Sequence, residues 1–296
     1  MAAGMTDRRR CAFIGLGAMG FPMAGHLASA GHVVTVYNRN PAKAERWRER
    51  FAGDRAPTPA AAAAGADFVF TCVGNDDDLR AVVSGADGVL AAMQPGAVLV
   101  DHTTASAGVA RQLAQQAARR GLGMLDAPVS GGQSGARNGV LTVMVGGEQA
   151  VFDRAEPLIA CFAQAVTLMG PAGYGQLTKM MNQICIAGLL QGLSEGVNFA
   201  QRAGLDVDKA LAVIAKGAAG SWQLDNRGAT MARDQFDFGF AVDWMRKDLD
   251  ICLAEAERVQ AETPVTALVN TFYARLQARG HGRWDTSSLI DLLRRP

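Results

Sequence analysis

The chain has 296 residues and a mass of 31.1 kDa, with a formal net charge of +1. This length excludes a disulfide-stapled miniprotein. Hydrophobic residues make up 49% of the chain and charged residues 19%, which excludes an intrinsically disordered chain. A net charge near zero argues against a nucleic-acid partner. The 34 glycines are a larger share of the chain than the average of about 7%, so some should stand where the backbone turns sharply or approaches a ligand.

The N-terminal segment admits two interpretations. Arg8, Arg9 and Arg10 precede an apolar run at residues 11–16, which resembles a secretory or twin-arginine signal. Gly15 and Gly17 break that run early, so we expect an exposed tail followed by a first strand. No stretch reaches the roughly 18 apolar residues that a membrane helix needs, and we expect a cytoplasmic protein without a membrane partner.

The first half of the chain alternates between strand and helix patterns. Apolar, β-branched runs predict strands at residues 11–15, 33–37, 67–73, 97–100, 124–126 and 141–145. Helical spacing predicts helices at residues 19–30, 42–51, 77–83 and 109–120, and the alanine run at 60–64 reads as another. This alternation predicts an α/β fold with a doubly wound, parallel sheet of the Rossmann type.

The second half predicts an all-helical domain. Long helical patterns cover residues 176–203, 206–216, 242–261 and 265–279. We therefore predict a Rossmann-type α/β domain at residues 1–168 and an all-helical domain at 169–296. The first long helix should join them.

A glycine motif follows the first strand. Gly15, Gly17 and Gly20 form G-x-G-x-x-G between a strand and a helix, the context in which this motif cradles a pyrophosphate. The phosphates would lie at the helix N-terminus, where free N–H groups and the dipole favour anions. The predicted cofactor contacts are Gly15, Leu16, Gly17, Ala18, Met19 and Gly20. The alternative is a tight strand–helix turn without a ligand.

The end of the second strand bears on cofactor choice. An Asp or Glu usually stands there to bind the ribose hydroxyls of NAD, but this chain has Asn38 and Arg39. Arg39 could pair with a 2′-phosphate while Asn38 forms a hydrogen bond nearby. We therefore predict NADP as the cofactor and keep NAD as possible. The alternative is that Arg39 is a solvated turn residue.

A lysine enters the most apolar helix. Lys179 and Asn182 are three residues apart and share one helix face, although their neighbours are apolar. Burying a lysine is costly unless it has a partner or a function, and desolvation can move its pKa toward the range useful for proton exchange. The alternative is a lysine that snorkels at a helix end.

Three loops follow strand ends, where doubly wound folds bind ligands. Ser130, Gly131 and Gly132 offer a hydroxyl and open N–H groups, which suits a carboxylate. The segment at 101–106 carries hydroxyls that could touch a ligand or cap a helix. The acidic run at 76–78 resembles a metal site, but such a run more often caps a helix.

We expect no bound metal, since neither the histidines nor the cysteines show the spacing of metal ligands. All the cysteines should be reduced and buried, namely Cys11, Cys72, Cys161, Cys185 and Cys252.

Taken together, these segments resemble the β-hydroxyacid dehydrogenase family over nearly the whole chain. The resemblance is carried by residues 15–23, 126–132, 173–182 and 247–249, in this order. It implies hydride transfer between a nicotinamide cofactor and a small hydroxy acid, oxo acid or semialdehyde. The family includes 3-hydroxyisobutyrate dehydrogenases, tartronate semialdehyde reductases and glyoxylate/succinic semialdehyde reductases.

The resemblance also implies roles for individual residues. Lys179 would be the catalytic acid/base, oriented with the substrate by Asn182. The implied substrate contacts are Ser130, Gly131 and Gly132. The implied cofactor contacts, beside the glycine loop, are Val73, Gly74, Thr104 and Lys247. Trp222 follows a glycine-rich bend and could close over the substrate, although a core or interface tryptophan is an equal alternative.

Two other functions fit the same architecture. Imine reductases share it, and some relatives bind nucleotides without catalysis, but both usually lack the lysine, so Lys179 counts against them. Gly188, Gly192 and Gly196 recur every four residues and predict a stripe that packs against a helix of this chain or of a second subunit. We expect a homodimer or homotetramer.

Overall fold

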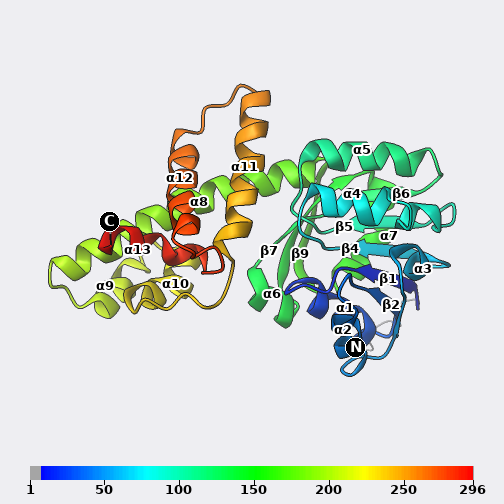
Figure 1. Cartoon of the computed structure of the whole chain (residues 1–296), viewed down its shortest axis with the longest axis horizontal. Coiled ribbons are helices and arrows are strands. Elements are labelled where there is room, and N and C mark those ends of the chain that lie inside the picture. The colour runs from blue at the N-terminus through cyan, green and yellow to red at the C-terminus, as the bar shows by residue number, and fades with distance from the viewer. Residues whose placement is uncertain (1–7, 296) are drawn as a thin grey trace. The chain divides into compact units, whose positions relative to one another are not determined.

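The computed structural model describes residues 8–295 (Figure 1). Its contacts divide the chain into two compact units, Met1–Lys179 and Met180–Pro296, of which the first is α/β and the second helical. The boundary lies inside the longest helix, α8 (Tyr174–Arg202). Each unit has its own hydrophobic core.

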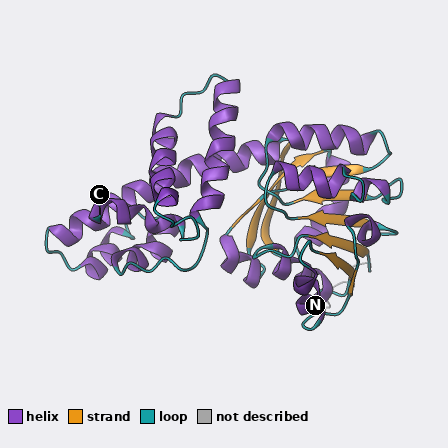
Figure 2. Ribbon diagram, in the orientation of Figure 1, coloured by secondary structure: helices purple, strands orange, loops and turns teal. Residues whose placement is uncertain are grey.

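A nine-stranded sheet forms the centre of the first unit (Figure 2). Its order is β3-β2-β1-β4-β5-β6-β8-β7, and β9 also pairs with β8. The strands are β1 (Arg10–Ile14), β2 (Val33–Tyr37), β3 (Asp54–Arg55), β4 (Phe68–Thr71), β5 (Val98–Asp101), β6 (Gly123–Asp126), β7 (Val129–Ser130), β8 (Leu141–Gly147) and β9 (Ala163–Gly170). Because β1 lies between β2 and β4, the loops that follow these strands meet at one edge of the sheet.

Alternating side chains place a separate core on each face of the sheet. Phe13 and Phe70 point into one core with α1 and α2, whereas Ile14 and Val69 point into the other with α4 and α5. The helices of this unit are α1 (Gly20–Ser29), α2 (Pro41–Arg48), α3 (Pro59–Ala63), α4 (Asp76–Ser84), the 3-10 turn Val89–Ala91, α5 (Ala107–Ala118), α6 (Gly132–Asn138) and α7 (Gln149–Ile159). The predicted doubly wound arrangement is confirmed.

The far side of the sheet differs from the all-parallel prediction. β8 runs antiparallel to β6 and β7, and β9 then pairs with β8 in parallel. Only the seven-residue α6 lies between β7 and β8, which is too short for a crossover helix that spans the sheet. β7, β9 and α7 were not predicted. β9 alternates between exposed and half-covered residues after Ala163, so its apolar pattern is weak.

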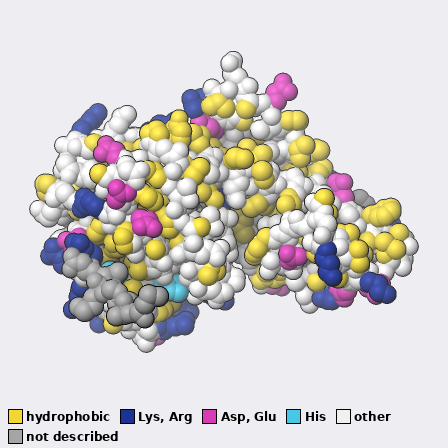
Figure 3. Space-filling view, turned by 180° about the vertical axis from the view of Figure 1, so that it is seen from behind, with side chains coloured by type: hydrophobic (Ala, Val, Ile, Leu, Met, Phe, Trp, Pro, Cys, Tyr) yellow, Lys and Arg dark blue, Asp and Glu magenta, His cyan; other side chains and the backbone are white. Residues whose placement is uncertain are grey.

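In the described residues of the second unit, all the regular elements are helices, beside one isolated antiparallel bridge between Ala241 and Asp285. After α8 the unit contains α9 (Val207–Ile214), α10 (Trp222–Ala232), α11 (Val242–Arg258), α12 (Pro264–Ala278), the 3-10 turn Thr286–Ile290 and α13 (Asp291–Arg294). One core joins α8, α11 and α12 around Met245, Leu249 and Tyr273. A smaller core joins α9 and α10 to the rest of α8. Figure 3 shows hydrophobic side chains that remain at the surface of this unit.

The glycine stripe of α8 has two different environments. A side chain at Gly188 would approach Val265 of α12 at 3.6 Å, whereas Gly192 and Gly196 are exposed, with no atom within 4 Å of an added Cβ. A helix of the same chain therefore covers the stripe only at Gly188, and packing of Gly192 and Gly196 against a second subunit stays a prediction. They line an apolar groove of about 460 Å³ with residues of α9 and the start of α10.

The cysteine prediction needs one correction. None of the five cysteines forms a disulfide in the described structure, but Cys185 is exposed on α8, while only Cys11 and Cys252 are fully buried. The apolar run around Cys185 belongs to a helix with one exposed side, so the run did not report burial. Within residues 8–295, no helix is long and apolar enough to cross a membrane.

Candidate active site

The glycine loop after β1 has the geometry of a phosphate-binding turn. Gly15 has φ of +99°, and a side chain at Gly20 would strike the Gly15 carbonyl and the Phe13 ring, so both positions require glycine. Gly17 and Ala18 are exposed between them. No side chain caps the N-terminus of α1 at Met19, so no side chain occupies the positive end of this helix dipole, where an anion is favoured. The loop therefore fits a dinucleotide pyrophosphate.

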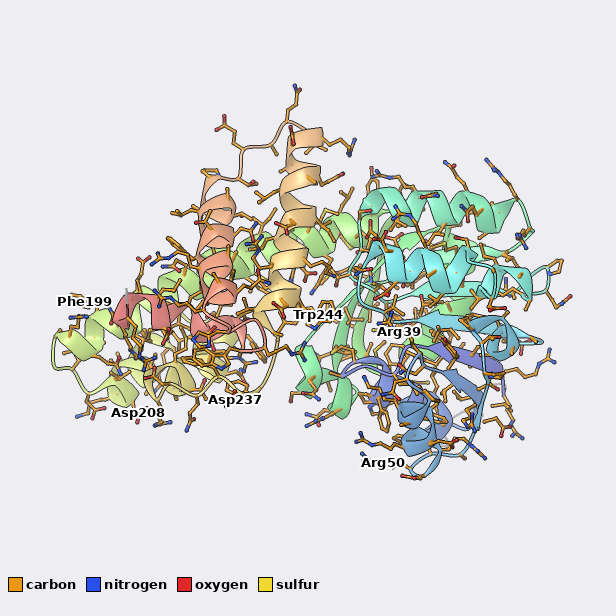
Figure 4. All side chains as sticks on the ribbon, viewed as in Figure 1. Arg39, Arg50, Phe199, Asp208, Asp237 and Trp244 are labelled. Atoms are coloured by element: carbon orange, nitrogen blue, oxygen red, sulfur yellow. The ribbon has the colours of Figure 1, made fainter. Side chains whose placement is uncertain are left out.

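Asn38 and Arg39, which follow β2, have different surroundings. The Asn38 side chain accepts a hydrogen bond from Leu16 N at 2.9 Å and donates one to the Asn40 carbonyl at 3.0 Å. Asn38 thus fixes the glycine loop to the end of β2. Arg39, which is labelled in Figure 4, has a side chain that is 86% exposed. Its guanidinium pairs with Asp78 of α4 at 3.0 Å.

Thr103 connects the loops after β4 and β5. Its hydroxyl accepts a hydrogen bond from Val73 N at 3.1 Å, and its own N–H donates to Asp101 Oδ1 at 3.1 Å. Val73, Gly74 and Thr104, the predicted cofactor contacts, lie on these two half-buried loops. The hydrogen bonds of Thr103 hold the loops together at the same sheet edge as the glycine motif.

The start of α8 is fastened to that edge by two buried side chains. Asp126, at the end of β6, accepts hydrogen bonds from Gly173 N at 2.7 Å and Gln176 N at 2.9 Å. The Gln176 side chain accepts one from Ala105 N at 3.0 Å and donates one to the Thr103 carbonyl at 2.7 Å. Gln176 is fully buried. One turn later stands Lys179, itself only 7% exposed.

Burial controls the ionisation of the groups under this edge. Asp101 and Asp126 are register neighbours on β5 and β6, and burial raises the pKa of Asp101 to about 7 and that of Asp126 to about 6. A charge on Asp126 also disfavours a charge on Asp101. Burial lowers the pKa of His102 to about 4, and its Nδ1 donates to the Ala127 carbonyl at 2.6 Å. His102 stacks on Phe70 and is therefore a structural residue.

Ser130, Gly131 and Gly132 form an open turn beyond β6. Ser130 ends β7, and the two glycines are exposed with φ of +122° and +61°. A Cβ at Gly132 would meet no atom, so its backbone conformation, not crowding, requires glycine there. This turn presents a hydroxyl and unobstructed backbone groups, as a carboxylate site needs.

In the helical unit, two predicted residues belong to one polar chain. Asn182 donates to Gln183 at 2.7 Å, and Gln183 donates to Asp248 of α11 at 2.7 Å. Lys247 pairs with the other oxygen of Asp248 at 2.9 Å. Gln183 and Asp248 are each 2% exposed. The buried pair thus links α8 to α11 and orients the two residues that the sequence singled out.

Trp222 has a separate anchor. It begins α10 and is 49% exposed, with the Arg227 guanidinium 5.0 Å above its ring and 4.9 Å from the ring of Phe238. Arg227 in turn donates to the buried Asp285 at 3.1 Å. Trp222 is therefore held at the surface of its unit and is not a core tryptophan.

The structure links several of the predicted residues of the α/β unit, but not all of them, through connecting residues that the sequence did not reveal. Val73, the loop of Thr104 and the helix of Lys179 are joined through Thr103, Asp126 and Gln176. The glycine loop is held separately, by the bond from Leu16 N to Asn38. The missed residues act over long sequence separations. The sequence could have pointed to them only by their position, since Asp126 is the last residue of a strand and Gln176 lies in the first turn of the helix that carries Lys179.

Family models match almost the entire chain. The model for the NAD-binding domain of 6-phosphogluconate dehydrogenase matches residues 10–170. The model described as the NAD-binding domain of NADP-dependent 3-hydroxyisobutyrate dehydrogenase matches residues 173–293. The chain belongs to the β-hydroxyacid dehydrogenase family.

Individual members of the family align from end to end. An uncharacterised oxidoreductase of Shewanella frigidimarina is 60% identical over 95% of this chain and 97% of its own length. The 3-hydroxyisobutyrate dehydrogenase of Pseudomonas aeruginosa is 35% identical over 98% of this chain and 99% of its own. The solved 3-hydroxyisobutyrate dehydrogenase of Mycobacterium tuberculosis with L-serine has a TM-score of 0.88 at 30% identity, covering 97% of this chain and 100% of that chain. As a member of this family, the chain is an NAD(P)-dependent oxidoreductase of hydroxy acids.

Proposed function

We propose that this β-hydroxyacid dehydrogenase interconverts a small hydroxy acid and its oxo acid or semialdehyde, with Lys179 as the acid/base and NADPH as the preferred reductant. The observation that carries this proposal is the set of buried hydrogen bonds that holds the start of α8 against the sheet. Asp126 and Gln176 tie the helix that bears Lys179 to the loop that bears Thr104, at the edge where the glycine motif lies. A proton donor and a nicotinamide site are thus built into one rigid framework.

The roles follow from the chemistry of each group. A bound reduced nicotinamide supplies the hydride. Ser130, Gly131 and Gly132 bind the carboxylate of the substrate, and Lys179 donates a proton to the carbonyl oxygen in reduction or accepts the hydroxyl proton in oxidation. Asn182 orients the lysine or the substrate. We further assign Trp222 to substrate binding and Lys247 to cofactor binding.

Two observations support NADP. The strand end that usually carries a carboxylate for NAD carries Arg39 instead, whose guanidinium is exposed to a ligand. The family model that matches residues 173–293 describes an NADP-dependent enzyme. The remaining cofactor contacts in this proposal are the glycine loop from Gly15 to Gly20, together with Val73, Gly74 and Thr104. Asn38 contributes by holding the loop through Leu16.

Replacing the lysine tests the mechanism. Lys179→Ala should lower kcat by about 100- to 10,000-fold, the usual contribution of a positioned acid/base. NADPH binding, followed by its fluorescence, should be unchanged, and the exposed Lys216→Ala should behave as wild type. Turnover close to wild type in Lys179→Ala would favour imine reduction or another chemistry. Absence of turnover in the wild type with firm NADPH binding would favour a non-catalytic nucleotide-binding relative.

The substrate can be found with a small panel. Glyoxylate, succinic semialdehyde, tartronate semialdehyde and methylmalonate semialdehyde should be compared by NADPH oxidation, and the panel should be repeated with NADH. At least one of them should be turned over with NADPH at a higher kcat/KM than with NADH. A reversed preference would contradict the assignment of NADP.

We also propose that residues 1–168 form the cofactor domain and that 169–296 provide substrate and subunit contacts, with a second copy of the chain seated on the glycine groove. The groove is lined by apolar and small residues without a charge, and Leu189 and Ile214 beside it are 37% and 43% exposed. Gly192→Leu should fill the groove without disturbing its own unit, because an added Cβ at Gly192 has open space. Sedimentation should show the wild type as a dimer or tetramer and the variant as a smaller species. An unchanged assembly would contradict this docking.

A further inference from the structure

We propose that Asp78 weakens the selection of a 2′-phosphorylated cofactor by holding Arg39 in an ion pair that the phosphate must displace. The inference rests on the proposed NADP preference and names the residue that limits it. Its starting point is the contact between Arg39 Nη1 and Asp78 Oδ1 at 3.0 Å. The two residues are 39 positions apart in the sequence, so the pairing could not be predicted from a local sequence pattern.

The Arg39–Asp78 pair lies where the adenosine half of a dinucleotide would bind. Arg39 follows β2, and Asp78 is in the first turn of α4, which follows β4. Because β1 lies between β2 and β4, the pair joins the two segments that flank the glycine loop after β1. Adenosine binds beside that loop in doubly wound folds, so a nucleotide meets Arg39 while it is already paired.

Among the described residues of the acidic run 76–78, only Asp78 forms an ion pair with Arg39. Asp76 accepts hydrogen bonds from the Ser106 backbone and hydroxyl at 2.8 and 2.5 Å. Asp77 is 94% exposed and pairs with Arg80 of its own helix at 3.2 Å. Asp78 faces Arg39. Asp77 is therefore a matched control, since it has the same charge in the same turn but a different partner.

The expected size of the effect follows from the exposure of the pair. Arg39 is 86% and Asp78 31% exposed, so the pair belongs to the weak surface class. A phosphate monoester carries more negative charge than a carboxylate and binds a guanidinium in a bidentate manner, so it can displace Asp78. Removing the competing carboxylate should then tighten binding of a 2′-phosphate about two- to fivefold.

Calorimetry with two nucleotides isolates this phosphate. 2′,5′-ADP carries it and 5′-AMP lacks it, and both should be titrated into the wild type, Asp78→Asn and Asp77→Asn. We expect Asp78→Asn to bind 2′,5′-ADP about two- to fivefold more tightly, 5′-AMP to be unaffected, and Asp77→Asn to match the wild type. Asparagine keeps the size of the side chain, and the backbone N–H of residue 78 keeps its bond to Asn75 at 2.8 Å. The ratio of kcat/KM for NADPH over NADH should rise by the same factor.

The outcomes separate the inference from the proposal beneath it. An equal gain in Asp77→Asn, or a gain from Asp78→Asn that persists in an Arg39→Ala background, overturns the role of the pair and indicates general charge repulsion. A wild type that binds 2′,5′-ADP more tightly than 5′-AMP, with no change in Asp78→Asn, overturns the role of Asp78 alone. A wild type that binds both nucleotides equally, with or without Arg39, overturns the NADP assignment together with the inference.

Discussion

Replacing Gln176 by leucine isolates the connection between the lysine helix and the cofactor loop. The leucine side chain is similar in size but has no polar atoms. It would leave Ala105 N and the Thr103 carbonyl without the partners that Gln176 now provides at 3.0 and 2.7 Å. The site is fully buried, so water cannot replace those partners freely.

The cost can be worked out from these two contacts. A buried polar group without a partner costs about 1–3 kcal/mol, so Gln176→Leu should lower the free energy of unfolding of the α/β unit by about 2–6 kcal/mol. Urea titration followed by circular dichroism measures this loss. Gln191→Leu is the matched control, because Gln191 lies on the same helix and bonds only to Glu195 at an exposed site.

Activity measured far from the unfolding transition gives the second readout. The loop that carries Thr104 and the turn that carries Lys179 lose their shared anchor, so kcat should fall toward the roughly 100-fold loss that a small misplacement can cause. The KM for the substrate should change much less, since Ser130–Gly132 is a separate turn. Unchanged stability and unchanged kcat in Gln176→Leu would refute the proposed fastening.

Two further substitutions test the buried charges. Burial raises the pKa of Asp101 to about 7, above its unfolded value, so its stabilising contribution is complete only at acidic pH and is lost as the pH rises through about 7. The free energy of unfolding of Asp101→Asn, measured relative to wild type, should therefore improve between about pH 5 and about pH 8, and a constant difference would contradict the cause given for the shift. Asp248→Leu leaves the Lys247 ammonium and the Gln183 amide without the carboxylate they share, and it should destabilise the helical unit by about 3 kcal/mol in urea titration. The exposed Asp237→Ala should have no such effect, and equal behaviour of the two variants would show that the polar chain does not contribute.

Local pattern was enough for the central part of the fold. Residues 33–37 were predicted as a strand and form β2, because a β-branched run there is bounded by turn residues on both sides. The glycine spacing likewise predicted the turn between β1 and α1. The antiparallel direction of β8 could not be predicted, because it depends on which strands β8 pairs with in the sheet. α7 was missed because Pro157 interrupts its helical pattern.

The candidate site was predictable in its residue types but not in its connections. Lys179 stood out because a lysine in an apolar helix is unusual, and its burial agrees with that argument. Gln176 and Asp126 are separated by 50 residues, and their role exists only once β6 and α8 meet. The same holds for Gln183 and Asp248, which are 65 residues apart. Their partners are set by packing, which a sequence pattern does not contain.

The proton-transfer role of Lys179 is tested most directly by chemical rescue. The measurement is the kcat of Lys179→Ala with NADPH and its best substrate, taken with increasing concentrations of methylammonium at a pH where part of it is the free amine. We predict a kcat reduced by about 100- to 10,000-fold that recovers in part as the amine concentration rises, while NADPH affinity stays constant. A variant that turns over like the wild type without any amine would contradict the assignment of Lys179 as the acid/base.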